Sequence, residues 1–147
     1  MLAAGWEALA AAEVTQPMRG YGDMALLGGL PARLFLVTSG FRRLQQSKVR
    51  ALGLEQAFDA IYIDAIDEPD RTGKQGIFKL VMDTHRLAPQ EVLVVGDNPD
   101  AEIASGNRLG MITAQMLRPG VVRGDNADYH IGDLRELKAL LDRLAGP

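Results

Sequence analysis

The sequence predicts an α/β protein: a three-layer α/β/α sandwich around a mostly parallel sheet. Short continuous apolar runs, typical of strands buried on both faces, occur at 34–38, 60–64, 92–95 and 111–115. Helix-like segments separate these runs from residue 34 onward, which favours parallel strands joined by covering helices. A chain of 147 residues with 47% apolar and 5% aromatic residues fits one domain with an aliphatic core.

Composition excludes several classes of function. The net charge of −3 gives no reason to expect a nucleic-acid or membrane-surface partner. No apolar run approaches the ~20 residues that span a bilayer. The chain has no cysteine, which excludes a disulfide framework, a thiol nucleophile and a cysteine-ligated metal. A protein without cysteine suits a reducing compartment, so we expect a cytoplasmic location.

The first segment, about 2–13, is predicted to be a packing helix. Its apolar residues fall on one helical face: Leu2, Trp6, Leu9 and Ala10. It lacks a basic start, and Glu7 and Glu13 interrupt the apolar run, so we do not expect a targeting signal. A second helix, about 22–28, should end at Gly28-Gly29.

The remaining elements follow in regular alternation, and turn residues mark their ends. Gly53 and Gly110 end two of the helices, and Pro89 opens a tight connection. The sequence predicts, in order, strand 34–38, helix 41–52, strand 60–64, loop 65–73, helix 75–86, strand 92–95, helix 99–108, strand 111–115, loop 119–124, strand 129–131 and helix 133–144.

Residues 92–110 carry the clearest functional signal. A buried strand ends abruptly in Gly96-Asp97, and Asp100 and Glu102 follow at once. Ligand sites of open α/β sheets lie just beyond the carboxyl ends of the strands, and carboxylates there suit Mg²⁺. Two alternatives remain open: Asp97 as the cap of helix 99–108, and Asp100 and Glu102 as acids that complement the helix dipole.

A second group of residues suits a phosphate anion. Thr38-Ser39-Gly40 ends another buried strand, where a hydroxyl and exposed N–H groups can hold phosphate oxygens or simply cap the next helix. Lys74 precedes a helix and offers a point charge for a phosphoryl group, whereas Lys79 fits a helix surface better.

Three other features are interpreted as structural. The acidic run from Asp64 to Asp70 is expected to be a solvated loop. His85 and His130 have no partner spacing for a metal site or a catalytic triad, and both are expected to have structural roles.

The order of these motifs resembles the haloacid dehalogenase (HAD) superfamily, mostly Mg²⁺-dependent phosphatases with a Rossmann-like sheet, over roughly residues 22–144. The resemblance implies that Thr38 and Ser39 bind the phosphoryl group and that Lys74 neutralises its charge. It also implies that Asp97 ligates Mg²⁺, with Glu102 or Asp100 in support. The expected ligand is a small phosphorylated metabolite, and the substrate itself is not specified.

The chain departs from the family at its first motif, an apolar strand ending in Asp-x-Asp, which supplies the nucleophile and the general acid/base. No such strand precedes residue 34, so no nucleophile is identified, and Mg²⁺ binding is expected to be weak. We divide the chain into a helix or cap remnant at 1–21 and an incomplete HAD-like core at 22–147.

Without its central strand, the family's sheet would have unpaired edges beside Thr38 and Val95. Three explanations stand: a fragment or late-started reading frame, a sheet that closes up directly, or a second chain in the gap. Exposed edges also favour association between copies. The chain is expected to be a phosphate-monoester hydrolase or an inactive remnant of one, with a non-catalytic phosphate/Mg²⁺-binding or protein-interaction module as the alternative.

Overall fold

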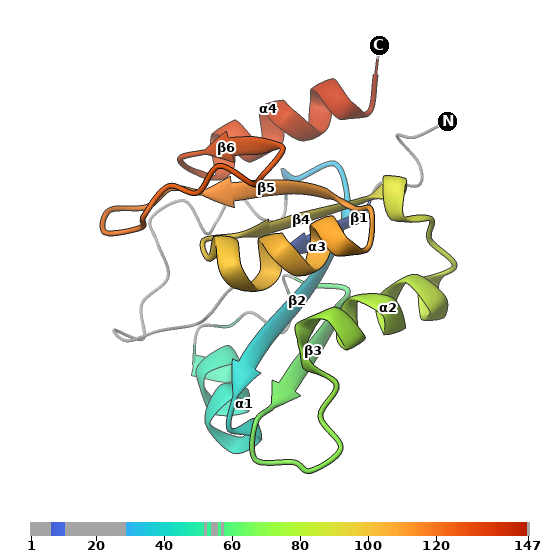
Figure 1. The fold of residues 1–147 in the computed structure, drawn as a ribbon, viewed down its shortest axis with the longest axis vertical. Helices are drawn as coiled ribbons and strands as arrows, with labels where there is room; N and C mark the ends of the chain where they lie inside the picture. Colours follow the sequence, from blue (N-terminus) through green and yellow to red (C-terminus); the bar gives the residue numbers. More distant parts are fainter. Residues whose placement is uncertain (1–6, 11–28, 52, 54–55, 57, 147) are drawn as a thin grey trace.

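One parallel sheet organises the molecule. The computed structural model describes residues 7–10 (backbone only), 29–51, 53, 56 and 58–146. The six strands have the order β3-β2-β1-β4-β5-β6, and every neighbouring pair is parallel. They are β1 (Glu7–Ala10), β2 (Arg33–Gly40), β3 (Ala60–Ala65), β4 (Val92–Gly96), β5 (Ile112–Met116) and β6 (Tyr129–Ile131). The predicted α/β class and parallel sheet are therefore confirmed (Figure 1).

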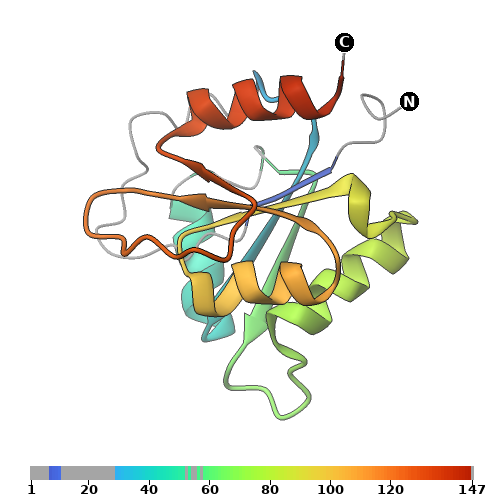
Figure 2. The same cartoon turned by 45° about the horizontal axis from the view of Figure 1, so that its top comes forward.

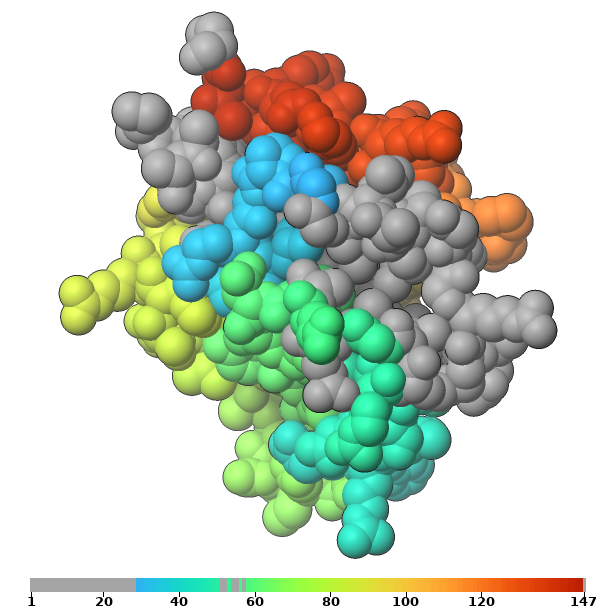
Figure 3. Space-filling view, turned by 180° about the vertical axis from the view of Figure 1, so that it is seen from behind, coloured from blue at the N-terminus to red at the C-terminus, as the bar shows by residue number. Residues whose placement is uncertain are grey.

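Helices cover both faces of this twisted sheet (Figure 2). The helices are α1 (Arg42–Ala51), α2 (Gly73–His85), α3 (Ala104–Arg108) and α4 (Leu134–Leu144). Two hydrophobic cores lie on the two faces of the sheet, and alternate residues of β2 contribute to each. Leu34 and Leu36 pack in the core with α4, while Phe35 and Val37 pack in the core with α2. Val49 of α1 belongs to the first of these cores. Seen from behind, α1 and α4 lie at opposite ends of the molecule (Figure 3).

The predicted helix over 2–13 is wrong at residues 7–10, which form β1. The backbone of β1 pairs with β2 on one side and with β4 on the other, from Glu7 opposite Arg33 and Val92 to Ala10 opposite Leu36 and Val95. Two strand edges that need hydrogen-bond partners outweigh the helical propensity of an Ala/Leu-rich segment. The gap expected in the sheet is therefore filled by this chain itself.

Two other predictions at the amino end are affected differently. The helix expected at 22–28 and the division between 21 and 22 lie outside the described residues, and the division stays a prediction. Because β1 pairs the inner edges of β2 and β4, association between copies through those two edges loses its basis. Association through the outer strands, β3 and β6, stays a prediction.

From residue 29 onward the predicted elements match the structure to within a few residues. The main difference lies at 99–108, where a single α-helix was expected. Residues Pro99–Ile103 form a wider π-helical turn before α3. A short 3-10 turn, Pro89–Glu91, leads into β4. Among the described residues, none of the helices has the length and apolar character required for a membrane span.

His85 has the structural role that its sequence context predicts. Its ring packs on Phe35, with 4.5 Å between ring centroids. Its Nδ1 lies 2.8 Å from Nη2 of Arg33, and its Nε2 lies 3.2 Å from the hydroxyl of Tyr62. Burial lowers the pKa of His85, and the neighbouring positive charge of Arg33 lowers it further. The neutral ring therefore acts as a packing and hydrogen-bonding group.

We expect Ala8→Pro to lower the free energy of unfolding by at least about 2 kcal/mol, because proline removes a ladder hydrogen bond from a central strand. Urea denaturation measures the loss, and Ala8→Ser, which keeps the N–H, is the matched control. Nuclear Overhauser contacts of Ala8 to both Leu34 and Leu93 should identify the strand in the wild type. Contacts between residues three apart along 7–10 would instead indicate a helix.

Candidate functional site

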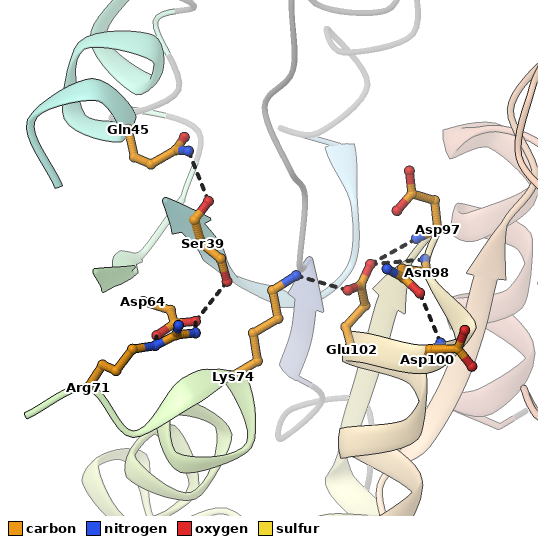
Figure 4. Close-up of polar contacts among 9 residues, drawn as sticks. All are labelled: Ser39, Gln45, Asp64, Arg71, Lys74, Asp97, Asn98, Asp100 and Glu102. Carbon is orange, nitrogen blue, oxygen red and sulfur yellow. Dashed lines mark hydrogen bonds and ion pairs between the residues drawn. The ribbon is translucent and has the colours of Figure 1, made fainter. Parts of the chain in front are cut away.

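The candidate site lies at the carboxyl ends of the central strands, where the sequence places it. β2 brings Thr38 and Ser39 to this edge, and β4 brings Gly96 and the following Asp97. Lys74 comes from the first turn of α2, and Glu102 from the π-helical turn after β4. Figure 4 shows Lys74 and Glu102 pointing toward each other between the two strand ends.

A buried ion pair joins Lys74 to Glu102. The ammonium Nζ lies 2.9 Å from Oε2 of Glu102, and the two side chains are 8% and 0% exposed. The other carboxylate oxygen, Oε1, accepts hydrogen bonds from the backbone N–H groups of Asp97 and Asn98, each at 3.1 Å. Charge pairing and three hydrogen bonds together compensate for the cost of burying this carboxylate. Glu102 therefore fixes both the lysine and the turn that follows β4.

Gly96 is required by the close approach of Glu102. A Cβ at this position would lie 2.1 Å from Cγ of Glu102 and 2.4 Å from its Oε1, far inside van der Waals contact. The missing side chain of Gly96 therefore makes room for the buried carboxylate.

The turn after β4 settles the open alternative for Asp97. Asn98 is the N-cap of the following helical turn, and its Oδ1 accepts the N–H of Asp100 at 2.9 Å. Asp97 is thus not the cap, and it is exposed at the strand tip. The Asp100 side chain points away from Lys74 (Figure 4). Of the three acids predicted here, only Glu102 directly contacts Lys74.

The described residues do not by themselves fit a Mg²⁺ site. Both oxygens of Glu102 are already bonded to protein groups. Within the described ranges, no group of three or more His, Asp or Glu side chains could hold a metal ion. Mg²⁺ prefers six oxygen ligands at near-ideal octahedral positions. Asp97 is one exposed carboxylate at this turn, which is far short of six oxygen ligands. Glu102 bonds Lys74 instead of a metal ion.

The β2 end is held by a glutamine that sequence analysis missed. Gln45 of α1 is 6% exposed, and its Nε2 donates to the backbone oxygen of Ser39 at 2.9 Å. Its Oε1 lies 3.4 Å from the Thr38 hydroxyl, which is fully buried. A Cβ on Gly40 would lie 2.0 Å from Nε2 of Gln45. A glutamine in an amphipathic helix carries no sequence signal for such a contact.

The interpretation of Asp64 as part of a solvated loop is wrong. Asp64 is the penultimate residue of β3 and is 3% exposed. Its carboxylate forms a bidentate pair with Arg71, at 3.0 and 2.6 Å, and accepts the Ser39 hydroxyl at 2.9 Å. The Ser39 and Thr38 hydroxyls therefore contact side chains rather than helix amides. The signal that could have revealed Asp64 is its position at a strand end.

The loop that follows β3, residues 66–72, is largely exposed but is held by charge pairing. Arg42 of α1 donates to both oxygens of Glu68, at 2.7 and 2.8 Å. The hydrogen bond from Arg42 lowers the pKa of Glu68, and partial desolvation opposes it. This pair holds the loop that leads into α2 and hence to Lys74. Lys79, the other lysine considered, is exposed on α2.

Comparison with known proteins now identifies the family. The chain matches the family model "haloacid dehalogenase-like hydrolase" over residues 10–110. This chain belongs to the haloacid dehalogenase-like hydrolases. It is 32% identical over 110 residues to phosphoserine phosphatase of Thermus thermophilus, covering 71% of this chain and 42% of that relative. The chain spans about half the length, or less, of the curated relatives it matches.

Two solved structures share the fold. An uncharacterised protein from Listeria monocytogenes serotype 4b has a TM-score of 0.76 at 14% identity, over 95% of this chain and 98% of that one. The putative HAD-hydrolase YfnB from Bacillus subtilis, described as bound to magnesium, has a TM-score of 0.61 at 24% identity, over 76% and 50% of the two chains. The family model and the phosphatase relative, with the shared fold, confirm the predicted HAD-like, phosphatase-like recognition.

We expect Glu102→Gln to lower the free energy of unfolding by about 3–5 kcal/mol, because it leaves a buried ammonium without its counter-charge. Adding Lys74→Met should recover part of this loss, since the double variant buries no net charge at the pair. Urea denaturation of the wild type, both single variants and the double variant gives the coupling energy. Strictly additive losses would contradict a direct, buried interaction between the two side chains.

Proposed function

We propose that this chain binds small phosphorylated metabolites at the site around Lys74 and turns over phosphate monoesters at no more than a trace rate. The observation that carries the binding proposal is the buried ammonium of Lys74. An ammonium has three N–H donors, and within the described part of the chain Glu102 is the one acceptor of Nζ. A phosphate oxygen matches the remaining donors, and charge-assisted bonds to such an oxygen are strong.

Neighbouring groups support the same proposal. Thr38 and Ser39 lie at the end of β2, and the strand order puts the ends of β2 and β4 on either side of β1. Parallel α/β proteins bind ligands at such carboxyl ends. The roles predicted for Thr38 and Ser39 in phosphate binding remain part of this proposal. Both hydroxyls would have to rotate away from their present side-chain partners to serve a phosphate.

The low turnover follows from the sequence after the central strand. Members of the family with the full first motif carry Asp-x-Asp there, whereas in this chain Ala10 is followed by Ala11-Ala12-Glu13. Glu13 brings one carboxyl group to this segment, but Ala11 and Ala12 supply no nucleophile. The family's route through an aspartyl-phosphate cannot begin without one. A binding role without efficient hydrolysis is therefore favoured over an active phosphatase.

The proposed location is the cytoplasm, on the composition of the chain, and the proposed partner class excludes nucleic acid and membranes. Mg²⁺ remains a proposed, weakly held cation. Asp97 would be its main protein ligand, and Asp100 and Glu102 are weaker candidates. The further oxygens would have to come from residues outside the described part, from water or from the phosphate itself.

With p-nitrophenyl phosphate and Mg²⁺, the purified chain should release p-nitrophenol at a rate close to the uncatalysed rate in buffer alone. Loss of a nucleophile typically removes several orders of magnitude in rate, and loss of a general acid about 10²–10⁴-fold more. A family phosphatase with an intact Asp-x-Asp motif is the positive control. Robust multiple turnover that disappears in Asp97→Asn would contradict the proposal. It would implicate another acid, first Asp23, which lies outside the described residues.

Calorimetric titration separates the roles of Asp97. In buffer with EDTA, Asp97→Asn should bind inorganic phosphate roughly three to ten times more tightly than wild type, because the substitution removes a like-charge repulsion of about 1 kcal/mol. Titration with Mg²⁺ should give weak heats in the wild type and none in the variant. Asp83→Asn, at an exposed position on α2, is the matched control. Equal Mg²⁺ affinities in wild type and Asp97→Asn would remove Asp97 from the cation site.

A further inference from the structure

A second buried glutamine organises the loop beside the candidate site. Gln115 of β5 is fully buried, and β5 pairs it with Gly96 at the end of β4. Its Nε2 donates to the backbone oxygen of Asp97 at 3.1 Å and to that of Val122 at 2.9 Å. Its Oε1 accepts the N–H of Gly124 at 2.8 Å. One carboxamide therefore joins the turn after β4 to the loop after β5.

The two loop residues held by Gln115 are the neighbours of Arg123 in the chain. Val122 is held through its carbonyl oxygen and Gly124 through its N–H, so the backbone of Arg123 is fixed on both sides. The same Nε2 that holds Val122 also holds Asp97. The backbone at Arg123 is thus fixed close to the strand tip that carries Asp97.

Further contacts hold the loop in the same place. His130 of β6 bonds the backbone oxygen of Gly124 through Nε2 at 2.7 Å, and Asn126 donates to the backbone oxygen of Pro99 at 2.8 Å. A Cβ on Gly124 would lie 2.6 Å from Cβ of Pro99, so the loop packs directly on the turn after β4. Figure 1 shows the loop, drawn in orange after β5, at the same edge of the sheet as the β4–α3 turn.

Arg123 differs from the arginines that build the site. Arg71 and Arg42 are committed to carboxylates, Asp64 and Glu68. Arg123 is exposed, and no hydrogen bond or ion pair joins its side chain to any of the described residues. A fixed backbone thus carries a charged side chain that no carboxylate within the described ranges neutralises. Its guanidinium presents a planar fork of donors that matches a carboxylate in bidentate geometry.

We propose that Arg123 is a specificity-determining residue that binds a second acidic group, a carboxylate, on the phosphorylated ligand. This inference rests on the proposed phosphate site around Lys74 and adds the class of ligand: small phosphate esters that also carry a carboxylate. Gln115 is the positioning residue, because it holds the backbone on both sides of Arg123 and ties it to the Asp97 turn. The phosphate then contacts Lys74 of α2, and the carboxylate contacts Arg123 in the loop after β5.

The test compares two ligands that differ only in the acidic group. Phosphoglycolate carries a carboxylate where ethyl phosphate carries a methyl group. Calorimetric titration of the full chain, with Mg²⁺ held at one concentration, gives the ratio of their affinities. We expect wild type to prefer phosphoglycolate about three- to tenfold, as for a charge pair at a partly exposed site. Arg123→Gln should bring the ratio close to one, and Arg123→Lys should retain part of the preference.

Two more variants separate recognition from general structure. Arg135→Gln removes an exposed arginine of α4 and should leave the ratio as in wild type. Gln115→Met removes the three hydrogen bonds at similar volume and should lower the ratio although Arg123 is still present. Circular dichroism and urea denaturation establish whether each variant folds. If Gln115→Met does not fold, the Arg123 variants still decide the proposal.

The outcomes distinguish this inference from the function on which it rests. Equal affinities of wild type for the two ligands, or an unchanged ratio in Arg123→Gln, would overturn the role of Arg123 and leave the phosphate site standing. If neither ligand nor inorganic phosphate binds, the proposed phosphate site fails and the role of Arg123 fails with it. A ratio that falls equally in Arg135→Gln would indicate a non-specific effect of net charge and would also overturn the inference.

Discussion

The buried ion pair between Lys74 and Glu102 is the interaction on which the site depends. It links the start of α2 to the turn after β4, and its carboxylate also holds the N–H groups of Asp97 and Asn98. A buried pair of this kind gives little net stability compared with apolar packing, but breaking it is costly. The pair matters here for geometry, because it holds the Lys74 ammonium rigidly at the edge of the sheet. The remaining N–H groups of that ammonium could donate to a ligand. Gly96 is the condition for this arrangement, since any side chain there would displace the carboxylate.

Because Glu102 neutralises Lys74, the pair itself has no net charge. A phosphate at the proposed site would therefore gain from directional hydrogen bonds more than from a strong positive field. Mg²⁺ at the proposed Asp97 position would add positive charge beside it. The exposed Arg123, in the loop after β5, would provide positive charge for the second acidic group of the proposed ligands.

Much of the fold could be predicted, because most strands from 34 onward are short apolar runs and a glycine or proline follows each helix between them within a few residues. The family motif also indicated the strand ends at which the candidate residues Thr38, Lys74 and Asp97 come together. The strand at Glu7–Ala10 could not be predicted from local pattern, since its Ala/Leu composition favours a helix and only its pairing with β2 and β4 makes it a strand. The contacts of Gln45 and Gln115 were equally hidden, because they join segments distant in sequence and glutamine has no local signature for them.

The two buried glutamines explain how the site can be rigid without becoming more acidic. Gln45 fixes the end of β2 and Gln115 fixes the turn after β4, each through hydrogen bonds to backbone groups. A glutamate in place of Gln115 could accept the N–H of Gly124 but could not donate to two carbonyl oxygens, and its charge would repel a phosphate. A lysine could donate but could not accept. A carboxamide satisfies both kinds of backbone partner and adds no charge beside the proposed anion site, so a ligand there would meet donors already held in place.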